Sequence, residues 1–142
     1  MAPPATKFQF NPTTPAFLLT AENIEKVVNS KLVQSNNSFG TKLFLNIAKE
    51  NLKNNVFISP ISASIALQML YNGADGKTKE EMSRILEIDK FSLDELNSLN
   101  RILSTKLSNP AEDITLNVAN SVWANSKQTE FIPQFSKNLK TF

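Results

Sequence analysis

The stretch from Asn55 to Ile88 constrains the fold most, because it joins a short apolar run, an almost wholly apolar helix and an amphipathic helix. The apolar run Val56–Ile58 favours a short buried strand. Ser59 followed by proline is typical of a helix start, since serine caps free amides and proline lacks a donor that would be unpaired there. The helix that follows, predicted over 60–72, is apolar on nearly every face, so we expect it to be buried.

Two turns follow this helix. Gly73 is expected to end it, because glycine adopts the left-handed conformation at little cost. Asp75 and Gly76 turn the chain again. Thr78 and Glu81 then have the spacing of a capping box, which predicts an amphipathic helix over 78–87.

Periodicity and capping predict the remaining elements. Ser92 and Glu95 form a second capping box at the start of a leucine-striped helix. Apolar and polar residues alternate between Ile114 and Val122, which indicates a long strand with one apolar face, interrupted at Asn120. The further expected elements are helices over 36–51, 92–108 and 133–140, a short helix within 24–33, a strand over 113–123, and a short strand candidate at 8–10.

Several of these motifs together resemble the N-terminal part of serpins, a family of serine protease inhibitors. The central match is NVFISPISASIALQM followed by NGADGKTKEEM. Asn37–Gly40 with Lys42–Phe44 resembles the first helix of that fold, Leu116–Trp123 its long second strand, and Phe131 with Phe135 the next helix. The resemblance covers about 36–142. It implies an α+β fold, namely the N-terminal helical part of a serpin with one long strand of the main sheet, incomplete at residue 142.

The resemblance also implies candidate site residues. Ser59 and Ser62 correspond to the family's shutter, beneath the opening in the main sheet, where hydroxyls join a polar network that governs strand insertion. Asn55 corresponds to an asparagine on the preceding strand, and Thr78 to a structural position after the turn. The alternative roles are a helix cap for Ser59, a locally satisfied hydroxyl for Ser62 and a plain turn residue for Asn55.

The implied function is suicide-type inhibition of a serine or cysteine protease by the full-length form. In serpins a reactive loop near the C-terminus is cleaved as bait and inserts into the main sheet as an extra strand. That loop would lie beyond residue 142, so we expect no catalytic residue and no reactive-centre bond in this chain. Two alternatives stay open: a non-inhibitory serpin acting as a binding or chaperone-like protein, and a free-standing helical interaction module.

Composition excludes several other classes of function. The chain has no cysteine and no histidine, so disulfides and Ser-His-Asp or Cys-His catalysis within it are ruled out. The net charge is only +2 without a basic cluster, so neither a nucleic acid nor an anionic membrane is an expected partner. Some serpins bind sulfated polysaccharides on the helix corresponding to 92–108, but Arg101 and Lys106 alone make no clear heparin site. We expect Trp123 to pack rather than to bind a ligand, and we expect no cofactor and no metal.

The ends of the chain give the remaining expectations. Residues 1–35 are predicted to be a partly flexible lead-in, whose first twenty residues are either a flexible tail or loosely packed, followed by an incomplete serpin domain over 36–142. The run Ala16–Leu19 is too short for a signal-peptide core, so the compartment stays open between the extracellular habit of the family and the cytoplasm. With the C-terminal serpin portion missing, we expect the apolar helix and the long strand to leave surface uncovered and the isolated chain to associate.

Overall fold

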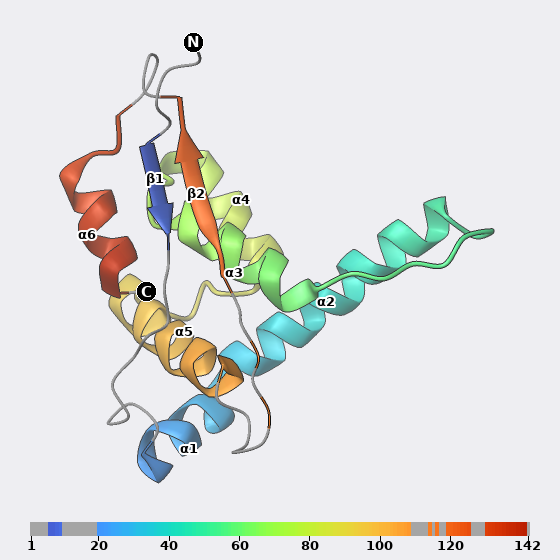
Figure 1. Ribbon diagram of the computed structural model, residues 1–142, viewed down its shortest axis with the longest axis horizontal. Coiled ribbons are helices and arrows are strands. Elements are labelled where there is room, and N and C mark those ends of the chain that lie inside the picture. The colour runs from blue at the N-terminus through green and yellow to red at the C-terminus, as the bar shows by residue number, and fades with distance from the viewer. Residues whose placement is uncertain are drawn as a thin grey trace.

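The computed structural model describes residues 6–9, 20–108, 114, 116, 119–125 and 130–141, with the backbone alone for 6–9 and 141. The described part is mostly helical with a small two-stranded sheet, which is compatible with a partial serpin fold (Figure 1). Its elements are, in order, β1 (Thr6–Gln9), α1 (Ala21–Asn29), α2 (Lys31–Glu50), α3 (Pro60–Tyr71), α4 (Gly76–Leu86), α5 (Leu93–Ser108), β2 (Ser121–Ala124) and α6 (Pro133–Thr141).

Helix α3 lies between two hydrophobic clusters. On one side α3 meets α2, α4 and α5 around a larger core. On the other side Ile65 and Met69 pack against Phe135 and Leu139 of α6, with Val122 of β2 alongside. The larger core consists of Val27, Leu32, Phe39, Tyr71, Leu86, Ile88, Leu96, Leu99 and Ile102. The prediction that the 60–72 helix is buried is therefore confirmed, and the expectation that it lacks partners is wrong, because α6 and β2 cover its second side.

Helices α2 and α3 approach each other closely near their crossing. A Cβ added at Gly40 would lie 2.7 Å from the Cβ of Pro60, closer than real Cβ atoms come to one another. A side chain at this position would therefore force the two helices apart. Gly40 fixes where the start of α3 rests on α2.

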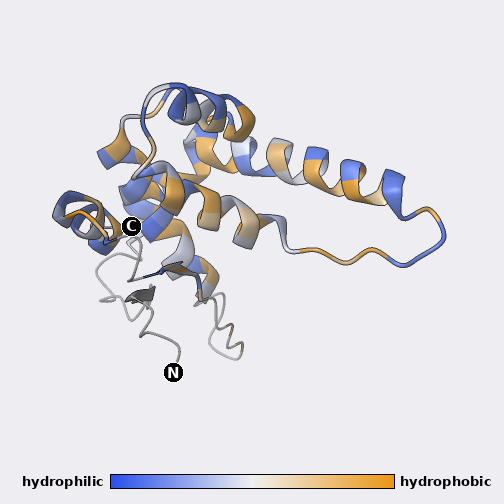
Figure 2. Cartoon of the chain, turned by 90° about the horizontal axis from the view of Figure 1, so that it is seen from above, coloured by the Kyte–Doolittle hydropathy of each residue, from blue (hydrophilic) through white to orange (hydrophobic). Residues whose placement is uncertain are grey.

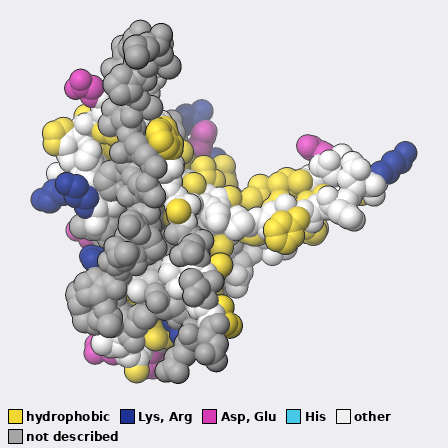
Figure 3. All heavy atoms as spheres, in the orientation of Figure 1, with side chains coloured by type: hydrophobic (Ala, Val, Ile, Leu, Met, Phe, Trp, Pro, Cys, Tyr) yellow, Lys and Arg dark blue, Asp and Glu magenta, His cyan; other side chains and the backbone are white. Residues whose placement is uncertain are grey.

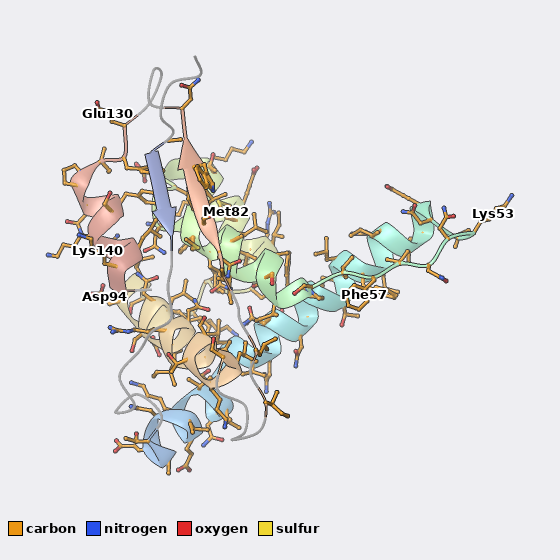
Figure 4. All side chains as sticks on the ribbon, viewed as in Figure 1. Lys53, Phe57, Met82, Asp94, Glu130 and Lys140 are labelled. Atoms are coloured by element: carbon orange, nitrogen blue, oxygen red, sulfur yellow. The ribbon has the colours of Figure 1, made fainter. Side chains whose placement is uncertain are left out.

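The second half of α2 and the returning chain, residues 44–59, project from the body as an arm (Figures 1 and 2). Hydrophobic side chains gather along it (Figure 3). Phe57 points away from the body on this arm, and Lys53 lies at its tip (Figure 4). Phe57 is 98% exposed and Leu52 is 85% exposed. Uncovered apolar surface is thus present on the arm, where the sequence did not predict it. Apolar side chains are also exposed on the predicted elements, namely Leu70 of α3 and Ile114, Leu116 and Trp123 of the expected strand.

The sheet pairs two strands that lie far apart in the sequence. β1 runs antiparallel to β2, with Thr6 opposite Ala124 and Gln9 opposite Ser121. Thr6–Gln9 thus forms a strand inside the stretch that the sequence assigned to a flexible tail. In the predicted strand 113–123 the structure has strand only from Ser121 onward, and residues 113, 115, 117 and 118 lie outside the described residues. Among the described residues, β2 pairs with the four residues of β1.

Three local expectations are corrected. Val56–Ile58 is not a strand, because no neighbouring strand pairs with it in the described part of the chain. Helix α4 begins at Gly76 with Asp75 at the N-cap, so Thr78 lies inside the helix and forms no capping box with Glu81. The left-handed glycine is Gly76 rather than Gly73.

Candidate functional site

The predicted shutter residues lie at the N-terminal end of α3. Ser59 occupies the N-cap position, yet its side chain does not cap the helix. Its hydroxyl instead donates to Oγ of Ser62 at 2.9 Å. The structure therefore brings these two serines together, whereas the expected capping role of the Ser59 side chain is wrong. Asn55 and Thr78 are both exposed and lie on the arm and on α4, respectively.

A groove of about 600 Å³ lies beside this serine pair, between α2 and the chain that leads into α3. Its lining is mainly apolar and includes Phe44, Phe57 and Ile61. Most of its walls belong to the arm and to the first turn of α3. The serine pair thus stands next in sequence to Ile58, Pro60 and Ile61, which line this groove.

A buried network of amide and hydroxyl side chains lies deeper, where α2, α3 and α5 meet. Gln68 is its centre: its Nε2 donates to Oδ1 of Asn36 at 3.1 Å and to Oγ of Ser64 at 2.7 Å. Its Oε1 accepts from Nδ2 of Asn100 at 2.7 Å. The Ser64 hydroxyl donates to the same Asn36 oxygen at 2.6 Å. Gln68 thus links three helices through one buried side chain.

Asn72 and Asn97 extend this network through a reciprocal pair of hydrogen bonds. Nδ2 of Asn72 donates to Oδ1 of Asn97 at 3.0 Å, and Nδ2 of Asn97 donates back to Oδ1 of Asn72 at 2.8 Å. Both side chains are buried. Because an unpaired buried amide is costly, this pair fixes how α3 and α5 are aligned.

Sequence reasoning missed this network, although a signal was present. Ser64, Gln68 and Asn72 recur every four residues on the apolar helix, and Asn97 and Asn100 share one face of α5. Two matching polar stripes on neighbouring helices indicate that they face each other. The network also buries Asn36, the acceptor of an Asn-Asn-Ser glycosylation sequon, so the folded chain does not present that side chain for modification.

Some buried polar atoms of these helices have no partner. They are Nδ2 of Asn36, Oδ1 of Asn100, and the hydroxyls of Ser104 and Ser108. Asn100, Ser104 and Ser108 recur every four residues, so they lie on one stripe of α5. Besides the predicted leucine stripe, α5 therefore has a buried polar stripe. Some of the hydrogen-bonding atoms of this stripe have no partner.

Glu87 links the end of α4 to α2. It has the left-handed conformation (φ 57°) that glycine usually adopts after a helix. Its backbone oxygen accepts from the Ser35 hydroxyl at 2.7 Å. Its carboxylate accepts from Ser38 at 2.7 Å and pairs with the Lys42 ammonium. These two side chains, Lys42 first, hold the pKa of Glu87 below its usual range.

Two kinds of site are absent from the described residues. Among these residues no three Asp or Glu side chains group closely enough to hold a metal ion. Of the helices that the structure describes, none is both long and apolar enough to cross a membrane.

The family model of the serpins (serine protease inhibitors) matches residues 34–142. The chain belongs to the serpin family. The family model describes serine protease inhibitors, not proteases. The match begins within α2 and includes the serine pair, the buried network, the smaller cluster and all of the larger core except Val27 and Leu32.

The curated relatives carry the same family name or function. A leukocyte elastase inhibitor of Bos taurus is 33% identical over 105 residues, 74% of this chain and 27% of the relative. One from Xenopus tropicalis is 36% identical over 103 residues, 72% of this chain and 26% of the relative. Serpin B6 of Pongo abelii is 31% identical over 112 residues, 78% of this chain and 29% of the relative. This serpin chain thus spans little more than a quarter of the length of these relatives. No solved structure matches it significantly.

Proposed function

We propose that this serpin chain is the N-terminal part of a protein whose full-length form is a suicide-type inhibitor of a serine or cysteine protease. The carrying observation is that the serpin family model matches residues 34–142, while relatives named leukocyte elastase inhibitor or serpin B6 are matched over only 26–29% of their length. The fragment supplies scaffold, and the reactive loop belongs to the remainder.

Within that full-length form we propose a shutter role for Ser59 and Ser62, and structural roles for Asn55 and Thr78. The support is geometric: the two serine hydroxyls are hydrogen-bonded at 2.9 Å beside the apolar groove. Neither is held in the buried network, so both remain able to bond to another part of the protein. We expect Ser59→Ala and Ser62→Ala in the full-length form to raise the number of inhibitor molecules consumed per protease, and Ser98→Ala on exposed α5 surface to leave it unchanged.

The test of inhibition is a comparison of two proteins. The reading frame continued beyond residue 142 is expressed and incubated with leukocyte elastase, because relatives are named for this target. We expect a complex that survives SDS. Residues 1–142 alone should form none, and a complex from this fragment would show that the trapping element does not lie in the remainder. A complete protein that forms no complex with serine or cysteine proteases favours the non-inhibitory alternative.

The exposed arm supports a second candidate, a free-standing interaction module. Leu52 and Phe57 leave apolar area in water that a partner would bury at a gain of about 25 cal/mol per Å². We propose instead that the C-terminal serpin portion covers this surface in the full-length protein. Adding that portion as a separate chain should raise the fraction of soluble complex in sedimentation analysis. If residues 1–142 sediment as a compact monomer and do not bind the added portion, the free-standing module is favoured.

A further inference from the structure

Asn72 and Gly73, at the C-terminal end of α3, form the one Asn-Gly dipeptide of the sequence. An asparagine followed by glycine is chemically labile, because the next backbone nitrogen can attack the side-chain amide carbon without hindrance from a Cβ. Two independent features of the structure nevertheless require these two residue types here.

Gly73 is required by the packing of α6. A Cβ at this position would lie 2.8 Å from Cδ2 and 3.0 Å from Cε2 of Phe135. Phe135 is buried in the cluster that joins α6 to α3, so its ring is not free to move aside. Any residue larger than glycine at position 73 therefore separates α6 from α3.

Asn72 is required by the buried network. Its Nδ2 donates to Oδ1 of Asn97 and to the backbone oxygen of Gln68, each at 3.0 Å. An aspartate would place an acceptor where both partners are acceptors, and would bury a charge without a cation opposite it. The position therefore accepts an amide and rejects a carboxylate.

The folded state holds both reacting groups in place. All the hydrogen-bonding atoms of the Asn72 side chain are engaged with Asn97 and Gln68, and the side chain is buried. The Gly73 N–H donates to the backbone oxygen of Leu70 at 2.9 Å. For the nitrogen to reach the amide carbon, these bonds must break, which requires α3 to open against α5.

We propose that Asn72-Gly73 is a deamidation site that the fold keeps latent and that opening of α3 against α5 makes reactive. The Gly73 nitrogen loses its proton to a water base and bonds to Cγ of Asn72. The bond from Cγ to Nδ2 breaks and ammonia leaves, which gives a cyclic imide. Water then opens the imide on either side, leaving aspartate or isoaspartate. Because the network rejects this carboxylate, an opening that lasts long enough for reaction becomes irreversible.

The test follows deamidation by peptide mass mapping after incubation of the full chain at mildly alkaline pH, folded or in urea. Cleavage after Lys53 and Lys77 releases one peptide that also holds Asn54 and Asn55, which serve as internal references. We expect Asn72 to react fastest of the three in urea. In the folded chain we expect it to react at least about tenfold more slowly than in urea, because reaction then requires a minor open state. Equal folded and unfolded rates would overturn the proposal.

Two variant pairs test the role of the network. Asn97→Ala removes the partner of Asn72 and should raise its rate several-fold, whereas Asn46→Ala, at an exposed asparagine of α2, should not. If Asn97→Ala unfolds the chain, the Asn72 rate must equal that in urea; a rate that stays low contradicts the proposal. Asn72→Asp should lower the urea midpoint and Asn46→Asp should not. An Asn72→Asp chain with the urea midpoint of the original chain would refute the claim that the open state becomes irreversible after deamidation.

Discussion

Replacing Asn97 alone by leucine should destabilise the chain far more than replacing Asn97 and Asn72 together. The single change removes the two hydrogen bonds of 2.8 and 3.0 Å and leaves the buried Oδ1 of Asn72 without a donor. A buried polar group deprived of its partner costs about 1–3 kcal/mol, so with the lost bonds we expect a loss of about 2–4 kcal/mol. That is a large part of the roughly 5–15 kcal/mol by which an ordinary domain is stable.

The double change Asn72→Leu with Asn97→Leu leaves no orphaned amide between the two helices. The remaining effect is on the Gln68 carbonyl, which loses one of its donors. Replacing both members of a buried polar pair by apolar side chains of similar size is nearly neutral or stabilising, so we expect a net change within about 1 kcal/mol. Asn72→Leu alone orphans the Asn97 amide in the same way, so the coupling between the two sites should be at least about 3 kcal/mol.

Urea unfolding followed by far-UV circular dichroism measures these free energies. Ser98→Leu, at an exposed position of α5, is the matched control and should change the stability by less than about 0.5 kcal/mol. Additive effects of the two substitutions, or a single change no worse than the control, would refute the argument that the amide pair aligns α3 with α5.

Three further predictions follow from other contacts. Because the pKa of Glu87 is lowered, its contribution to the free energy of unfolding is present above the ordinary carboxyl pKa and is lost as the pH falls through the lowered value. Glu87→Gln should therefore lower the urea midpoint at neutral pH and leave it unchanged in strong acid. Gly73→Ala should cost about 1–3 kcal/mol by overpacking against Phe135, whereas an alanine at exposed Ser98 should not. Phe57→Ser should reduce self-association in analytical ultracentrifugation, whereas Val28→Ser, which also replaces an exposed apolar side chain by serine but on α1, should have little effect.

The helices could be read largely from local chemistry. Ser92 accepts from the Glu95 amide at 3.3 Å, as its capping box predicts, and α5 starts where that cap places it. The 60–72 helix was bounded within one residue, because Pro60 fixes its start and the apolar pattern its length. Such signals reside in a few consecutive residues, so they survive without knowledge of the tertiary fold.

The elements that depend on distant partners could not be read in the same way. Val56–Ile58 has the composition of a strand but lacks a neighbour, while Thr6–Gln9 becomes a strand because β2 pairs with it. The buried network was missed for the same reason. Gln68 looks like a lone polar residue on an apolar helix until Asn100 of another helix lies opposite it. The proposed roles of Ser59 and Ser62 rest on the resemblance together with their mutual hydrogen bond.

The pairing of β1 with β2 bears on the order in which the chain acquires its structure. Thr6 is synthesised before its partner Ala124, which follows on the order of a hundred residues later. Helices α1 to α5 are made between them and can form from contacts that are already available. The first strand must therefore wait with its backbone unpaired until Ser121–Ala124 has been made. Pairing of these two strands, which lie far apart in the sequence, is the step that we expect to come last and to be slowest. A nascent chain that stalls before Ser121 cannot complete it.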